Sequence, residues 1–235
     1  MLSAEALRLA AIEVLRPTSA VEAGAGYPTL AGLNVLDSRA IAVEDIDRDR
    51  SYTPILALYT ADAGVSLRGP HAAAWDTVAD AVLDVVAELG VVESDKDGEF
   101  ADALASTDPD ARLVLATLCS QVRYLLEQSQ AGGLWRHLVR QIVKIEYQPF
   151  SVPNIGIRWQ RITMRFHCEI HDDDFDTDGL PEPMGSLFAA LPSQSYAKAK
   201  LATLATHFSR DALRQLEGVD GTTGSRSPGF KVDFP

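Results

Sequence analysis

The chain has 235 residues with a formal net charge of -12, and 46% of its residues are hydrophobic. This composition excludes wholesale disorder, the acidic balance argues against binding along a nucleic-acid backbone, and no apolar run reaches the ~18 residues that span a bilayer. Cys119 and Cys168, the two cysteines, exclude a disulfide framework and indicate free thiols in a reducing compartment, and the first residues lack the basic and apolar regions of a secretory signal.

The first half of the chain predicts two helices and two strands. Apolar residues recur with the helical period over residues 2–16. After a glycine-rich connection, residues 34–39 and 54–60 read as strands, and the second is continuously apolar, as in a strand covered on both faces. Residues 71–89 carry an apolar stripe at helical spacing, and Gly90 follows them as a typical residue just beyond a helix.

The second half predicts two further helices and a β-hairpin. Residues 109–128 form a helix with Pro109 in its first turn. Residues 137–149 and 158–170 form the hairpin, whose second strand alternates apolar and polar residues. Residues 195–216 form an amphipathic helix.

Two acidic segments account for the net charge. Residues 93–110 hold seven acids and one base, and residues 169–182 hold seven acids and no base, whereas residues 111–168 hold eight bases and two acids. The simpler interpretation is that both are solvated loops that keep the protein soluble. The alternative is that their charge steers a partner or repels a polyanion.

Together these elements predict an α+β fold in which a mixed or antiparallel β-sheet packs against helices, with a C-terminal helical extension. We expect an α/β domain over residues 1–170, an acidic loop and helical extension over residues 171–218, and a flexible C-terminal arm over residues 219–235.

No catalytic motif is found. Gly24-Ala25-Gly26 lacks the third glycine of a dinucleotide-binding loop, and neither a P-loop nor a G-x-S-x-G nucleophile elbow occurs. The five histidines lack metal-binding spacing, since His167 and His171 are four residues apart at the end of a strand rather than on a helix. We therefore expect no enzyme activity, no catalytic residue and no cofactor.

One acidic run, Asp174-Phe175-Asp176-Thr177-Asp178-Gly179, matches the first half of a calcium-binding loop. Oxygens at alternate positions wrap the ion, and the glycine permits the sharp turn. The bidentate glutamate of the second half is missing, because Gly185 stands at loop position 12. A calcium site and a solvated acidic turn are both open, and we assign no metal ligand.

The polar face of the second hairpin strand is basic. It carries Arg161 and Arg165, and Arg140 and Lys144 lie on the neighbouring strand. Such a face can contact phosphates, but it lacks the interleaved aromatic residues of a single-strand-binding surface. We prefer pairing with acidic residues across strands or between subunits, so Arg161 and Arg165 are candidate subunit-interface residues.

A short motif within residues 31–60 indicates a known family. The segment G-x-x-V-x-D-S-R is followed by an acidic spacer and then by P-x-L-x-L-Y-T. This resembles the tail terminator (tail completion) proteins of long-tailed bacteriophages and gene transfer agents, and the later helices and hairpin follow in an order similar to that family. The resemblance covers about residues 1–170 and implies a compact α/β subunit with a mixed sheet packed against helices.

The resemblance also implies a function. It implies a hexameric ring that caps the tail tube, stops its polymerisation and docks it to the head connector, so the expected partners are further copies of the chain, a tail tube protein and a head–tail connector or stopper protein. DNA would pass through the ring without specific binding. The protein would lie in the neck of the virion, after assembly in the cytoplasm of a bacterial host.

Five residues match the family motif, namely Asp37, Ser38, Arg39, Tyr59 and Thr60. We expect Asp37 and Arg39 to pair within or between subunits, which makes both candidate interface residues. The chain departs from the usual pattern in its length, because an acidic loop, a helix and an arm follow the hairpin.

Two other functions are compatible with the sequence. One is another head–tail joining or tail-tube component of similar construction. The other, of a different class, is a calcium-dependent binding module or an enzyme that uses the acidic loop at residues 172–182.

Overall fold

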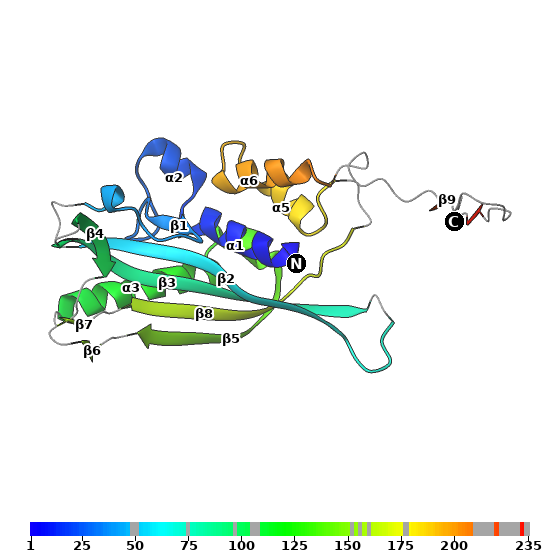
Figure 1. Cartoon of the computed structure of the whole chain (residues 1–235), viewed down its shortest axis with the longest axis horizontal. Coiled ribbons are helices and arrows are strands. Elements are labelled where there is room, and N and C mark those ends of the chain that lie inside the picture. Colours follow the sequence, from blue (N-terminus) through cyan, green and yellow to red (C-terminus); the bar gives the residue numbers. More distant parts are fainter. Residues whose placement is uncertain are drawn as a thin grey trace, which may run out of the picture.

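A computed structural model describes residues 1–47, 52–73, 76–95, 98–103, 109–150, 153–154, 157–158, 161–175, 179–208, 219–220 and 231–232. Its centre is a mixed six-stranded β-sheet with a layer of helices on one face (Figure 1). The predicted α+β class is therefore confirmed. None of the helices in these ranges is both long and apolar enough to span a membrane.

The sheet has the strand order β1-β2-β3-β8-β5. The bounds are β1 Val35–Asp37, β2 Thr53–Leu67, β3 Thr77–Asp95, β8 Arg161–Ile170 and β5 Val139–Phe150. β1 runs parallel to β2, and the other neighbours in this order are antiparallel. β4 (Gly98–Ala103) pairs with the last residues of β3. Two short pairs lie apart from this sheet, β6 (Pro153–Asn154) with β7 (Ile157–Arg158) and β9 (Val219–Asp220) with β10 (Lys231–Val232).

Helix α1 (Leu2–Leu15) is enclosed between two layers. The sheet lies on one side of it, and α5 (Met184–Ala190) and α6 (Tyr196–Ala205) lie on the other (Figure 1). Ten of its fourteen residues are buried, as is typical of a helix that is apolar on all sides. The remaining helical elements are α2 (Thr18–Ala23), a 3-10 turn (Val43–Asp45), α3 (Pro109–Glu127) and α4 (Gly133–Arg136).

The main core fills the space between the sheet and the helices. Alternate residues of β3 and β8 point into it, and Phe166 of β8 meets Trp135 of α4 edge to face, with ring centroids 6.0 Å apart. A second, smaller cluster covers the opposite face of β1 and β2; its buried members are Leu36, Ile41, Ile46, Ile55 and Ala57. This explains why the second predicted strand is apolar along its whole length.

The helix predicted at residues 71–89 is wrong, because β3 occupies most of this segment. The acidic residues Asp80, Asp84 and Glu88 recur every four residues, a spacing that keeps them on one face of either a helix or a strand. The valine-rich composition favours the strand, since β-branched side chains fit a pleated surface. Gly90 lies within β3 rather than beyond a helix, and a Cβ there would meet the Ile55 side chain at 2.6 Å.

Most other predicted elements are confirmed. The helices at 2–16 and 109–128 are α1 and α3, the strands at 34–39 and 54–60 are β1 and the first part of β2, and the hairpin is the antiparallel pair β5–β8. The acidic segment at 93–110 is no simple loop, because it holds the end of β3, β4 and the start of α3.

The predicted C-terminal extension belongs to the main fold as far as it is described. The first part of the helix predicted at residues 195–216 is α6. Residues 209–218 lie outside the described ranges, and so does most of the arm predicted at residues 219–235. The preceding helix α5 was not predicted. Leu187 of α5 and Leu201 of α6 are buried in the same core as α1, so the boundary at residue 170 does not separate two cores.

The C-terminal end of α3 is capped by an arginine of α4. The Arg136 guanidinium donates hydrogen bonds to the carbonyl oxygens of Leu126 (2.8 Å) and Ser129 (2.7 Å). This satisfies acceptors that a helix end leaves open and places a positive charge at the negative end of its dipole. Gly132 lies so close beneath that an added Cβ would approach the Leu125 carbonyl oxygen at 2.1 Å.

We predict that Gly132→Ala lowers the free energy of unfolding by about 1–3 kcal/mol through this overlap. The matched control is Gly133→Ala, where an added Cβ would meet no atom within 4 Å. Urea unfolding followed by circular dichroism measures both. Equal stability of the two variants would contradict the close packing at Gly132.

Candidate functional site

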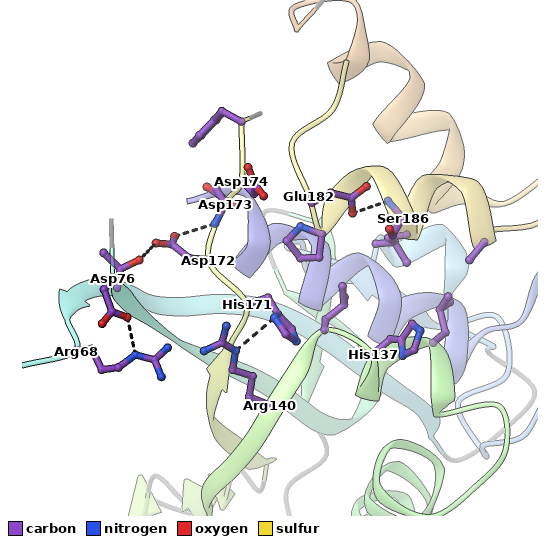
Figure 2. A pocket seen from close by; sticks show the side chains of 17 residues that line it. Arg68, Asp76, His137, Arg140, His171, Asp172, Asp173, Asp174, Glu182 and Ser186 are labelled. Carbon is purple, nitrogen blue, oxygen red and sulfur yellow. Dashed lines mark hydrogen bonds and ion pairs between the residues drawn. The ribbon is translucent and has the colours of Figure 1, made fainter. Parts of the chain in front are cut away.

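A cleft of about 1080 Å³ lies at one end of the sheet, where the β2–β3 turn, the end of β8, α4 and α5 meet. Figure 2 shows Arg140, His137 and His171 on one side of it and a row of acidic residues on the other. The acidic row comprises Asp172, Asp173, Asp174 and Glu182. The cleft thus places Arg140 and two histidines across from four acidic residues.

Asp173 in this row closes the start of α1. Its carboxylate accepts hydrogen bonds from the backbone N–H groups of Leu2 (2.8 Å) and Ser3 (2.7 Å) and from the Ser3 hydroxyl. A carboxylate at this position accepts hydrogen bonds from N–H groups that have no partner within the helix. Its negative charge also interacts favourably with the positive end of the helix dipole. Asp172 accepts from the Thr77 hydroxyl at the start of β3 (2.5 Å). The acidic segment at 169–182 is therefore partly structural, and not only the solvated loop that we expected.

The half calcium motif is only partly described. Asp174 and Glu182 exchange two backbone hydrogen bonds of 2.9 and 3.0 Å, which close the loop between them. Asp176 and Asp178 lie outside the described residues. Over the part of the chain that is described, no three His, Cys, Asp or Glu side chains gather as a metal site requires. Calcium binding stays a hypothesis.

His171 on the opposite wall contacts a permanent charge. The Arg140 Nε–H donates a hydrogen bond to His171 Nδ1 (3.3 Å). Partial burial, followed by the charges of Arg140 and His137, lowers the pKa of His171. The neutral imidazole therefore fits this wall better than the charged form does.

Asp37, the first acidic residue of the family-like motif, is held within the chain. Its carboxylate forms an ion pair with Arg8 of α1, with Nε and Oδ1 2.9 Å apart, and accepts a hydrogen bond from the Tyr196 hydroxyl of α6 (2.9 Å). Burial and the contact with Asp37 raise the pKa of Tyr196. Arg39, the partner expected from the sequence, forms no ion pair with Asp37 within the described chain, and pairing of the two between subunits stays a prediction.

Arg165 is also paired within the chain. Its guanidinium forms two parallel hydrogen bonds of 2.8 Å with the carboxylate of Asp84, which lies directly opposite on β3. This confirms the preferred cross-strand pairing and corrects the description of this face as basic, because β3 adds Asp80, Asp84 and Glu88 to it. Arg161 lies opposite Glu88 in the same register. Interface contacts by these arginines stay a prediction.

The sequence does not predict the charged residues through which α1 contacts its neighbours. Besides Arg8, the carboxylate of Glu13 accepts hydrogen bonds from the Thr18 N–H and hydroxyl (both 2.9 Å) and from the Ser195 hydroxyl (2.7 Å). A charged residue inside an otherwise apolar helix is a signal of such a contact, because buried charges need partners. The sequence alone does not identify those partners.

No protein-family model matches this chain, and no curated protein matches it as a relative.

We predict that Asp173→Ala lowers the free energy of unfolding by about 0.5–2 kcal/mol, because the start of α1 loses its acceptor. Glu22→Ala is the control, since it removes the same charge from an exposed position on α2. Thermal and urea unfolding measure the difference. If the two variants are equally stable, the carboxylate of Asp173 is not the cap of α1.

A second prediction concerns pH. Because the folded pKa of His171 lies below the unfolded value of about 6.5, its stabilising contribution is present above that pH and is lost as the pH falls. The melting temperature of the wild type should therefore drop more between about pH 7.5 and about pH 5.5 than that of His171→Gln. Carboxylate titration is common to both proteins and cancels, so equal drops would contradict the lowered pKa.

Proposed function

We propose that this chain is a structural virion protein without enzyme activity, a tail terminator that forms a ring, caps the tail tube of a long-tailed phage or gene transfer agent and joins it to the head connector. The observation that carries the proposal is the environment of the motif residues. Asp37 and Ser38 form a structural corner where the end of β1 meets β2, α1 and α6, and the five motif residues do not line the cleft.

The corner is built from β1 and β2. Asp37 lies opposite Leu58 in the parallel register, and the chain turns sharply at Ser38, whose φ is 50°. The Ser38 N–H donates to the Leu58 carbonyl (2.9 Å), which locks the turn against β2. With Asp37 joined to Arg8 and Tyr196, the D-S-R segment connects the sheet to α1 and α6. A family motif with this environment is better suited to shaping a subunit than to reacting with a substrate.

The fold and the charge agree with the proposal. The resemblance implies a mixed sheet packed against helices, and this chain has one. A ring of subunits with net charge -12 would repel DNA, and the guanidinium of Arg165 is already paired with Asp84, so it is not free to release counterions from passing DNA. One part of the family-like order is lost, since residues 71–89 contain a strand.

Assembly and position on the particle test the proposal. Light scattering should give six times the 25.4 kDa of the chain, and electron microscopy should show six-fold rings. A gold-labelled antibody should mark particles at the neck only. Labelling along the whole tail would indicate the alternative, a tail-tube component, and labelling on the head would indicate another joining protein. A monomer absent from particles would overturn a structural role in the virion.

A further inference from the structure

The central sheet has open edges on both sides. In the ranges that the structure describes, β5 pairs with β8 alone, and β1 covers β2 only from Leu56 to Leu58. Residues 61–67 of β2, which we call the β2 edge, therefore have β3 on one side only, as β5 has β8. Open strand edges present unpaired N–H and C=O groups and are templates for pairing with another chain.

Both edges expose large apolar side chains. Val65 and Leu67 of the β2 edge are 47% and 54% exposed, and Val143 and Tyr147 of β5 are 65% and 45% exposed. Single exposed apolar residues are ordinary. Here they occur in pairs on two open edges. A strand added to either edge would cover such a pair, because side chains on neighbouring strands pack against each other.

The charges of the two edges differ in sign. The β2 edge carries Asp62 and no basic residue, whereas β5 carries Arg140 and Lys144 against the single acid Glu146. Like edges placed together would therefore bring like charges into contact, and unlike edges would not.

The strand directions fit a repeated contact between unlike edges. The pairs β2–β3, β3–β8 and β8–β5 are all antiparallel, so β5 runs opposite to β2. When β5 of one copy meets the β2 edge of an equally oriented copy, the new pair is also antiparallel, and the helix layers of both copies lie on the same side. Such a head-to-tail contact generates a ring when its rotation closes and an open filament when it does not, whereas pairing of like edges stops at a dimer.

We propose that copies of this chain join edge to edge, with β5 of one copy pairing antiparallel with the β2 edge of the next. The inference deepens the proposed function, since it rests on ring assembly and names the surfaces that meet.

Cysteine cross-linking tests the contact in the full chain. Val65→Cys and Val143→Cys are prepared separately and treated with a short bismaleimide, alone and mixed. The native thiols should not interfere, because Cys119 and Cys168 are buried and burial raises their pKa values to about 11 and about 12. We expect covalent dimers in the mixture and not in either variant alone, and a ladder of higher species from the double variant. The control is Leu113→Cys, at an exposed position on α3. It is mixed with one of the two edge variants in place of the other, and we expect no cross-link.

The outcomes separate this inference from the proposed function. Dimers from either single variant alone would indicate pairing of like edges and would overturn the inference. Rings seen without cross-links in the mixture would also overturn it and leave the tail-terminator proposal standing. Cross-links and ladders from a protein that is absent from the neck would support the contact between the two edges and overturn the proposed tail-terminator function.

A second variant tests the same contact without cross-linking. Val65→Lys places a positive charge on the β2 edge, opposite the basic residues Arg140 and Lys144 of the facing β5, and like charges directly opposite are destabilising. The light-scattering mass should fall from the ring to a single chain, while Leu113→Lys should leave the ring intact. Circular dichroism confirms that both variants are folded, and a folded Val65→Lys protein that still forms rings would overturn the inference.

Discussion

The burial of α1 between the sheet and α5–α6 is the constraint on which the rest of the structure depends (Figure 1). Because this helix lies between the sheet and α5–α6, its polar groups must find partners within the protein. Asp173 serves its first N–H groups, Asp37 pairs with Arg8, and Glu13 accepts hydrogen bonds from Thr18 and Ser195. Each contact fixes a different region of the chain against one central element.

This arrangement accounts for the position of both the motif and the cleft. The D-S-R corner lies where β1 and α6 meet α1, so its acidic residue is used in holding three elements together. The cleft lies at the start of the same helix, and its acidic wall includes the residue that caps it. The C-terminal helices cover α1 directly, which makes them part of the core and not an appendage.

The sequence correctly predicts the elements in which the spacing of apolar residues fits either a helix or a strand but not both. α1, α3 and the β5–β8 hairpin belong to this group, because their apolar residues recur at one period only. The prediction fails for β3 because its apolar residues also match a helical stripe, although the buried ones alternate from Ala79 to Leu89 as in a strand. The strands that pair with β3 on both sides are not visible in the local pattern. The contacts of the site could not be predicted for a related reason, since Tyr196 lies 159 residues from Asp37 in sequence.

The long separation between α1 and its cap has a consequence for synthesis. A helix that begins at Leu2 receives its acceptor from Asp173, 171 residues later. On the ribosome, α1 emerges long before this residue and before α5 and α6, which cover one side of its buried residues. Contacts of such separation slow folding and prolong the exposure of apolar surface. We therefore expect the nascent chain to need chaperones until its last helices are released.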